Sequence, residues 1–174
     1  MCGIVGALDW SGEYPPAVDQ LKRMLGIIRH RGPDEFGLYV DEKVGIGCAR
    51  LSIVDLHTGQ QPIANEDRTV QVVFNGEIYN HAELRRELEL RGHRFRTHHS
   101  DTEVLVHGYA EWGEDLPVRL NGMFAFALYD VRRRRLLCAR DRYGEKPFLY
   151  TATGEFFAFA SEYKALLALA EVER

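Results

Sequence analysis

Apolar positions along the chain fall mostly into short continuous or alternating runs, the pattern that predicts β-strands. A glycine-bracketed apolar run at 2–6 predicts a buried amino-terminal strand. The runs at 36–40 and 44–51 predict a hairpin across a short polar turn, with a further extended segment at 52–55. Other strands are predicted at 70–74, 123–129, 136–140, 148–151 and 156–160.

Four segments instead carry apolar residues at helical spacing. The first follows two prolines and places Val18, Leu21, Leu25 and Ile28 on one face. The other helices are predicted over about 80–92, 100–112 and 162–170. Two of them begin with a residue pair typical of a capping box, Asn80 with Glu83 and Ser100 with Glu103.

This order of elements predicts the fold class. Many strands joined by tight turns, with helices gathered early and at the end, favour an α+β fold of antiparallel sheets covered by helices. No linker, repeat or low-complexity segment interrupts the pattern, so we expect one domain over residues 1–174.

Composition narrows the class of protein. With 45% hydrophobic and 28% charged residues, the chain has the balance of an ordinary soluble domain. A net charge of -4 provides no general attraction for nucleic acid or an anionic membrane. No run of about 18 apolar residues and no secretory signal pattern is present, so we expect a cytoplasmic protein with no membrane partner.

The cysteine and histidine patterns predict neither disulfides nor a metal site. Three cysteines are an odd count without the density of a disulfide scaffold. Cys48 and Cys138 lie in apolar strand-like runs and are interpreted as inert buried thiols. The clustered histidines, among them His93, His98 and His107, lack zinc-site spacing.

Cys2 is the most informative residue for chemistry. Removal of Met1 would place a thiol and a free α-amino group on one residue. An α-amine has an ordinary pKa of about 7.7 to 8.0, so a useful fraction can accept a proton at neutral pH. The alternative is that Cys2 is only a small hydrophobic residue in a strand.

A thiolate that attacks an amide carbonyl needs hydrogen-bond donors for the developing oxyanion. Asn75-Gly76, directly after a predicted strand, offers a side-chain amide and a backbone N–H that can converge on one point. Asn-Gly is also typical of a type I′ hairpin turn. Here, however, 77–79 lead into a predicted helix and not into a return strand.

Six segments in this order make the chain similar to a known family, the class II, N-terminal-nucleophile glutamine amidotransferase domain found as the glutaminase half of asparagine synthetase. The segments are 1–6, 29–34, 50–55, 75–80, 100–104 and 140–144. The resemblance covers essentially the whole chain. It implies a four-layer αββα fold with two stacked antiparallel sheets between helical layers.

The resemblance also implies a reaction, the hydrolysis of L-glutamine to glutamate with ammonia passed to a second active site. It implies that Cys2 is the nucleophile through a thioester and that Asn75 and Gly76 form the oxyanion hole. Arg50 matches the residue that pairs with the substrate carboxylate, and Asp101 the one that accepts its ammonium.

The same resemblance implies further pocket residues. Ile53, Val54 and Glu77 match residues lining the glutamine pocket. Arg31, Gly32, Pro33 and Asp34 match a loop that closes over bound glutamine. From the residues alone, a solvated charge and a helix-dipole partner are the favoured explanations for Arg50 and Asp101.

The resemblance places a second, ATP-using domain after this one in asparagine synthetase, and the sequence lacks its Ser-Gly-Gly-x-Asp-Ser phosphate loop. We therefore expect a glutaminase half that needs no cofactor, with ATP and Mg belonging to the synthetase half. Its expected partners are L-glutamine and the synthetase domain or subunit that receives ammonia, with a homodimer as a further option. Three alternatives stay open: a glutamine-binding regulatory module, a half serving an acceptor other than aspartate, and a hydrolase for another amide.

Overall fold

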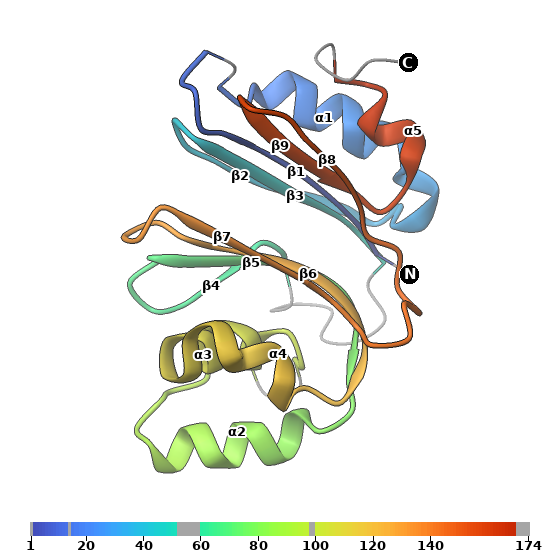
Figure 1. The fold of residues 1–174 in the computed structure, drawn as a ribbon. Coiled ribbons are helices and arrows are strands. Elements are labelled where there is room, and N and C mark those ends of the chain that lie inside the picture. The colour runs from blue at the N-terminus through green and yellow to red at the C-terminus, as the bar shows by residue number, and fades with distance from the viewer. Residues whose placement is uncertain (1, 14, 52–59, 98–99, 170–174) are drawn as a thin grey trace.

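The fold consists of four layers, with two stacked sheets enclosed between two groups of helices (Figure 1). The computed structural model describes residues 2–13, 15–51, 60–97 and 100–169. All strand pairs are antiparallel within these ranges. The α+β class and the αββα layering predicted above are confirmed.

The first sheet has β1 at its centre, in the order β2-β3-β1-β9-β8. Helices α1 and α5 cover its outer face (Figure 1). The strands of this sheet are β1 (Gly3–Asp9), β2 (Glu35–Val40), β3 (Val44–Arg50), β8 (Leu149–Ala152) and β9 (Phe156–Ala160). The helical segments beside it are α1 (Val18–Ile27), the 3-10 turn η1 (Arg29–Arg31) and α5 (Tyr163–Leu166).

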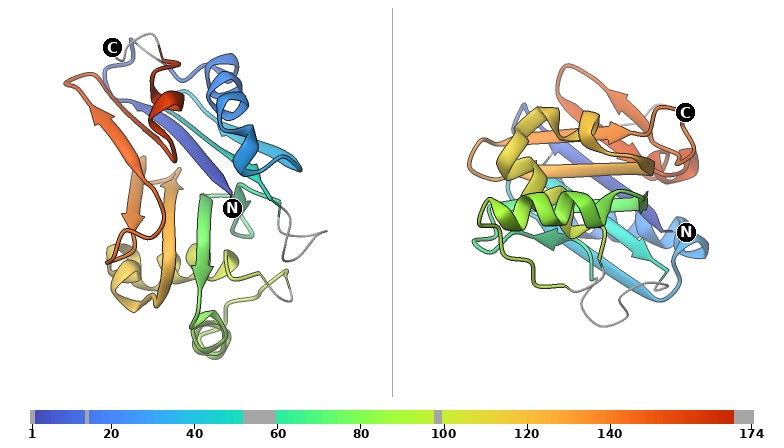
Figure 2. Two further views of the ribbon diagram at one scale, coloured as in Figure 1. Left: turned by 90° about the vertical axis from the view of Figure 1, so that its right-hand side faces the viewer. Right: turned by 90° about the horizontal axis from the view of Figure 1, so that it is seen from below.

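The second sheet has the order β4-β5-β6-β7, and helices α2 and α3 lie across its outer face (Figure 2). Its strands are β4 (Ile63–Ala64), β5 (Val70–Ile78), β6 (Gly122–Asp130) and β7 (Arg135–Arg140). The helical segments are α2 (His81–Leu90), α3 (Glu103–Trp112), η2 (Gly113–Asp115) and α4 (Leu116–Arg119).

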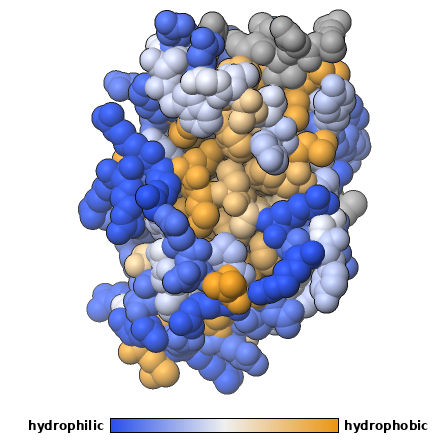
Figure 3. Space-filling model, in the orientation of Figure 1, coloured by the Kyte–Doolittle hydropathy of each residue, from blue (hydrophilic) through white to orange (hydrophobic). Residues whose placement is uncertain are grey.

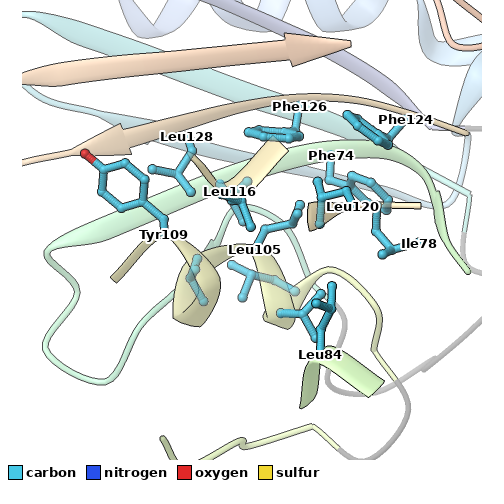
Figure 4. Packing of buried hydrophobic residues seen from close by; sticks show 14 of the residues in the cluster. Phe74, Ile78, Leu84, Leu105, Tyr109, Leu116, Leu120, Phe124, Phe126 and Leu128 are labelled. Atoms are coloured by element: carbon cyan, nitrogen blue, oxygen red, sulfur yellow. The ribbon is translucent and has the colours of Figure 1, made fainter. Parts of the chain in front are cut away.

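Three apolar layers hold the four structural layers together. One lies between the second sheet and its helices, where Phe74, Phe126 and Leu128 meet Leu105 and Leu116 (Figure 4). A second packs α1 and α5 on the first sheet. The third joins the two sheets and includes Ile4, Val44, Ile46, Cys48, Val73, Ala125, Ala127, Tyr129 and Phe159.

Strand alternation assigns each side chain of β1 and β3 to one of these layers. Ile4 and Cys48 are paired across the strands and face the second sheet, whereas Val5 and Ala49 face the α1 layer. Cys2 is two residues before Ile4 and packs against the same inter-sheet layer. The start of β1 therefore directs its thiol between the sheets.

The edges formed by β7 and β8 lie on one face of the molecule. An apolar area crosses the middle of this face (Figure 3). On β8, the edge strand of the first sheet, Leu149 is 40% exposed and Tyr150 67% exposed.

Most predicted elements are confirmed, and the differences concern lengths and short elements. β5 continues to Ile78 and does not end at 74, because its pairing with β6 runs through Ile78 opposite Gly122. The last helix is only Tyr163–Leu166, shorter than the predicted 162–170. The short α4 and β4 were not predicted, and the extended segment predicted at 52–55 lies outside the described residues.

Both predicted capping boxes are wrong. The Asn80 side chain does not cap α2; it donates to Arg119 O at 2.9 Å and accepts from Asn121 N at 3.0 Å. The buried Glu103 carboxylate instead accepts from the backbone N–H groups of Arg96 and Thr97, both at 2.8 Å. Longer-range hydrogen bonds thus replaced the local ones that the spacing suggested.

A pair of glycine substitutions tests the tight inter-sheet packing. Gly6 is paired with Phe159, and a Cβ at position 6 would overlap the Phe159 ring, which stacks on Phe148 with 5.0 Å between ring centroids. Gly6→Ala should lower the free energy of unfolding by about 1 to 3 kcal/mol.

The matched control is Gly26→Ala in helix α1, where a Cβ would meet no atom within 4 Å. It should stabilise the protein by roughly 0.5 to 1 kcal/mol, because alanine loses less backbone entropy in a helix. Urea unfolding measures both variants. An unchanged midpoint for Gly6→Ala would contradict the packing described here.

Candidate active site

Cys2 lies just before β1, half-buried at the mouth of the inter-sheet layer. Its Sγ is 4.0 Å from Leu51 O, which follows the end of β3. Its carbonyl oxygen accepts a hydrogen bond from Arg31 Nε at 3.2 Å. The backbone and the thiol of Cys2 are thus held by two different segments.

The Arg31 contact is itself fixed from the far end of the chain. Arg31 Nη1 lies 3.2 Å from Glu162 Oε1, and that carboxylate also pairs with His30 at 2.8 Å and Lys164 at 3.1 Å. Glu162 therefore orients the guanidinium that holds the Cys2 carbonyl.

The backbone next to Cys2 is held from the same end. Ser161 Oγ accepts from Ile4 N at 2.9 Å, and Ser161 N donates to Ile4 O at 2.8 Å. The short segment 161–162 therefore holds the start of β1 twice. Ser161 bonds directly to Ile4, and Glu162 acts on Cys2 through Arg31.

The Cys2 thiol is acidic. A hydrogen bond with the Cys48 side chain outweighs the effect of burial, and the pKa of Cys2 is lowered to about 6. The positive charge of Arg50 lowers this pKa further. Since an ordinary thiol has a pKa of about 8.5, Cys2 is a thiolate over most of the physiological range.

Asn75 lies inside β5, opposite Ala125 of β6, and therefore not in a turn or in a loop after the strand. Asn75 and Val73 are two residues apart on the strand, so their side chains point to the same face of the sheet. The Val73 side chain belongs to the inter-sheet layer, and the Asn75 amide therefore faces the same layer as the thiol of Cys2. Asn75 is 1% exposed, and its Nδ2 has no hydrogen-bond partner among the described residues. A buried donor without a partner is costly, so this amide is a marked candidate for a ligand contact.

The Gly76 N–H points away from β6. Its opposite residue, Phe124, uses both backbone groups on the other side, donating to Asp141 Oδ2 at 3.3 Å and accepting from Asp141 N at 2.8 Å. In an antiparallel ladder the backbone groups of Gly76 must then point to the side of β5 opposite β6. β4 pairs with β5 on that side only at Gln71 and Val72, so it does not reach Gly76.

The neighbouring outward N–H groups of β5 are used. Phe74 N donates to Gln61 Oε1 at 2.7 Å and Ile78 N to Asp101 Oδ2 at 2.9 Å. Between them, Gly76 N–H meets no acceptor in the part of the chain that the structure describes. A Cβ at 76 would also overlap the β6 backbone at Met123, which explains why this position is glycine.

Arg50 ends β3 and is 5% exposed. By strand alternation it shares the inter-sheet face with Cys48, and its charge acts on Cys2. Its Nη1 lies 2.9 Å from Glu35 Oε2, the residue opposite it on β2. The guanidinium is therefore a buried, oriented cation near the thiol, and not the solvated strand-end charge that was the alternative reading.

The loop 31–34 lies against the end of β3. A Cβ at Gly32 would overlap the carbonyl of Ala49, and Asp34 N donates to Arg50 O at 3.2 Å. Gly32 is buried between these contacts, whereas Pro33 and Asp34 are exposed. The loop predicted to lie near the site is thus attached to the strand that carries Arg50 and Cys48.

Asp101 comes just before α3 and accepts from Ile78 N at the end of β5. Burial raises the pKa of its carboxyl. Asp101 is therefore placed beside the strand end that follows Asn75 and Gly76, as is Glu77, which is exposed in β5. Ile53 and Val54 lie outside the described residues.

Three contributors to this region were not predicted as site residues. Cys48 was interpreted as inert but hydrogen bonds to Cys2, while Glu162 and Asp141 were not assigned any role. Asp141 accepts four backbone N–H groups, from Phe124, Tyr143, Glu145 and Lys146. Although burial opposes them, these bonds lower the pKa of Asp141.

The described residues contain no group of three or more His, Cys, Asp or Glu side chains placed to hold a metal ion. They also contain no helix long and apolar enough to cross a membrane.

Comparison with known proteins gives consistent findings. The family model described as "Glutamine amidotransferase domain" matches residues 1–174. Asparagine synthetase [glutamine-hydrolyzing] 3 of Bacillus subtilis is 45% identical over 176 residues, which cover 99% of this chain and 28% of that protein. Asparagine synthetase [glutamine-hydrolyzing] 3 of Arabidopsis thaliana is 46% identical, covering 95% of this chain and 28% of its own length. The chain thus spans little more than a quarter of these relatives.

Solved structures give the same fold. Glutamine phosphoribosylpyrophosphate amidotransferase of B. subtilis superposes with a TM-score of 0.74 at 22% identity, over 96% of this chain and 43% of that one. A structure described as the allosteric regulatory enzyme of purine biosynthesis gives a TM-score of 0.77, also at 22% identity, with the same coverage. At this identity the likeness supports the fold.

The acidity of Cys2 can be measured directly by alkylation with iodoacetamide, which reacts with the thiolate. The rate at Cys2, followed by mass spectrometry of its peptide, should rise with pH around a midpoint of about 6. Cys138 is the internal control, because burial raises its pKa to about 12 and it should stay unmodified. A Cys2 midpoint near the ordinary value of about 8.5 would contradict the site described here.

Proposed function

Since the chain belongs to the glutamine amidotransferase domain family, we propose that it hydrolyses L-glutamine to L-glutamate and ammonia, with Cys2 as the nucleophile. The observation that carries this proposal is an acidic thiol accompanied by two hydrogen-bond donors that have no acceptor among the described residues. One donor is buried, and the other is a backbone N–H that faces outward from its strand. These donors are Asn75 Nδ2 and the Gly76 N–H, on the strand stacked over β1 and β3.

In the proposed reaction the Cys2 thiolate attacks the side-chain carbonyl carbon of glutamine, so that a C–S bond forms and the carbonyl oxygen becomes an oxyanion. Asn75 Nδ2 and Gly76 N–H donate to that oxyanion. Collapse breaks the C–N bond, and the α-ammonium group of a processed Cys2 supplies the proton with which ammonia leaves. Water then hydrolyses the thioester to glutamate and restores the thiol.

Substrate orientation follows from opposite charges. The proposal assigns the α-carboxylate of glutamine to Arg50 and its α-ammonium to Asp101, which suits a zwitterionic amino acid. A planar guanidinium can form two parallel hydrogen bonds to a carboxylate, and Glu35 fixes its plane. Backbone of Ile53 and Val54, the Glu77 side chain and the loop 31–34 complete the proposed pocket.

The fate of ammonia is proposed from the relatives. The two asparagine synthetases reported above are more than three times as long as this chain, and we propose that ammonia passes to an ATP-dependent synthetase domain of the same kind. The absence of a cofactor in this domain, a cytoplasmic location and a homodimer stay predictions from the sequence.

Asn75→Ala tests the oxyanion hole. Because the amide would act mainly on the charged transition state, kcat for glutamate release should fall roughly 10²- to 10³-fold with a much smaller change in KM. The preparation is first checked by intact mass for loss of Met1. Asn121→Ala, an exposed asparagine outside the site, is the matched control and should keep the wild-type kcat.

A structural role for Asn75 predicts another result. The melting temperature would then fall while kcat per folded molecule stays within about threefold of wild type. Glutamate release by Cys2→Ala at the wild-type rate would refute the nucleophile assignment itself.

Arg50→Lys tests carboxylate recognition, measured by calorimetry of glutamine binding in a Cys2→Ala background that cannot turn over. Lysine keeps the positive charge but cannot form two parallel hydrogen bonds to a carboxylate, so the affinity for glutamine should weaken by about tenfold or more. Thermal unfolding serves as the control for the Glu35 contact. Equal affinity of both proteins would remove Arg50 from the substrate site.

A further inference from the structure

A second thiol lies beside the nucleophile in the inter-sheet layer. Cys48 of β3 is opposite Ile4 of β1, and Cys2 is two residues before Ile4 on the same face. The register therefore places Cys2 and Cys48 as diagonal neighbours on adjacent strands, and their side chains are joined by a hydrogen bond. Cys48 is 0% exposed, enclosed by apolar side chains of both sheets.

The two thiols form a hydrogen bond with a definite direction. It lowers the pKa of Cys2 and raises that of Cys48, which burial raises further. Cys48 consequently keeps its proton at every physiological pH. A protonated S–H beside a thiolate can only be the donor, so Cys48 donates and the Cys2 sulfur accepts.

Other charged groups face Cys2 from each neighbouring segment. Arg50 of β3 and the positive amino terminus lower its pKa, while Arg31 of η1 donates to its carbonyl and is neutralised by Glu162. Asn75 contributes a neutral amide from the inter-sheet face of β5. Cys48 is distinct among these because its donor acts on the sulfur itself.

We propose that Cys48 is a positioning residue of the active site, whose buried S–H donates to the Cys2 sulfur, stabilises the thiolate and aims it at the substrate. The effect on Cys2 protonation rests on the strand register together with the hydrogen bond between the two thiols, and it does not require glutaminase activity. Its consequence for turnover rests on the proposed glutaminase function.

The proton balance of the resting site follows from this arrangement. An α-amine ordinarily titrates at about 7.7 to 8.0, above a thiol stabilised in this way. After removal of Met1, the Cys2 thiol proton therefore resides on the α-amine of the same residue, and Cys48 keeps its own proton. The nucleophile is a thiolate–ammonium pair before substrate binds.

Alkylation separates this role from a merely structural one, using iodoacetamide as the probe and the pH midpoint at Cys2 as the readout. Cys48→Ala removes the donor and should raise the midpoint from about 6 by at least about one pH unit, a tenfold loss of thiolate at low pH. Cys48→Ser restores an O–H donor and should bring the midpoint back toward the wild-type value. Cys138→Ala removes a partly buried thiol of the same layer and should leave the midpoint unchanged.

The glutaminase assay is run on the same variants at pH 6.5. Cys48→Ala should lower kcat with little change in KM, because the substrate contacts are untouched. If Cys48→Ala shifts the alkylation midpoint but the wild-type protein releases no glutamate, the proposed function is refuted. The role of Cys48 in stabilising the Cys2 thiolate is supported by the same result.

An unchanged midpoint in folded Cys48→Ala, or an equal shift in Cys48→Ala and Cys48→Ser, would overturn the proposal. Thermal unfolding establishes that each variant is folded. If Cys48→Ala does not fold, Cys48→Ser and Cys48→Val form the comparison with and without a donor.

Discussion

The pairing of β1 with strands on both sides is the constraint on which the site depends. β1 lies between β3 and β9, and its register with β3 sets which side chains stand next to Cys2. A shift by one residue would turn the thiol toward the α1 layer, because side chains alternate faces along a strand. Hydrogen bonds between Ser161, which follows β9, and both backbone groups of Ile4 hold the start of β1 from its other side.

The inter-sheet layer gives the thiol its chemical character. It is apolar along most of its length, and at one end Cys48, Arg50 and Asn75 share the face of Cys2. Burial alone would raise the pKa of a thiol, as it does for Cys138. The opposite result at Cys2 comes from a donor and a cation placed beside it, and the apolar surroundings strengthen both interactions by lowering the local dielectric.

Much of this arrangement could be predicted from the sequence, because apolar periodicity and ordered motifs locate the strands, the layers and the segments that bear Cys2, Arg50, Asn75 and Asp101. The partners of these residues could not be. Cys48 was indistinguishable from Cys138 until the β1–β3 register placed it beside the nucleophile. The same limit explains the wrong capping boxes, since Asn80 bonds to a backbone carbonyl 39 residues away and Glu103 to the loop before its helix, and the capping spacing reveals neither.

The clamp formed by Glu162 and Arg31 has a consequence for how the protein is made. The segment that holds Cys2 is synthesised long after β1, since Ile4 and Ser161 are 157 positions apart. A nascent chain that stops short of β9 has one open side on β1 and no anchor for Arg31. Contacts of such long range close late in folding. The thiol of Cys2 is therefore held in place only once synthesis has passed Glu162, and a shorter nascent chain carries the cysteine without its supports.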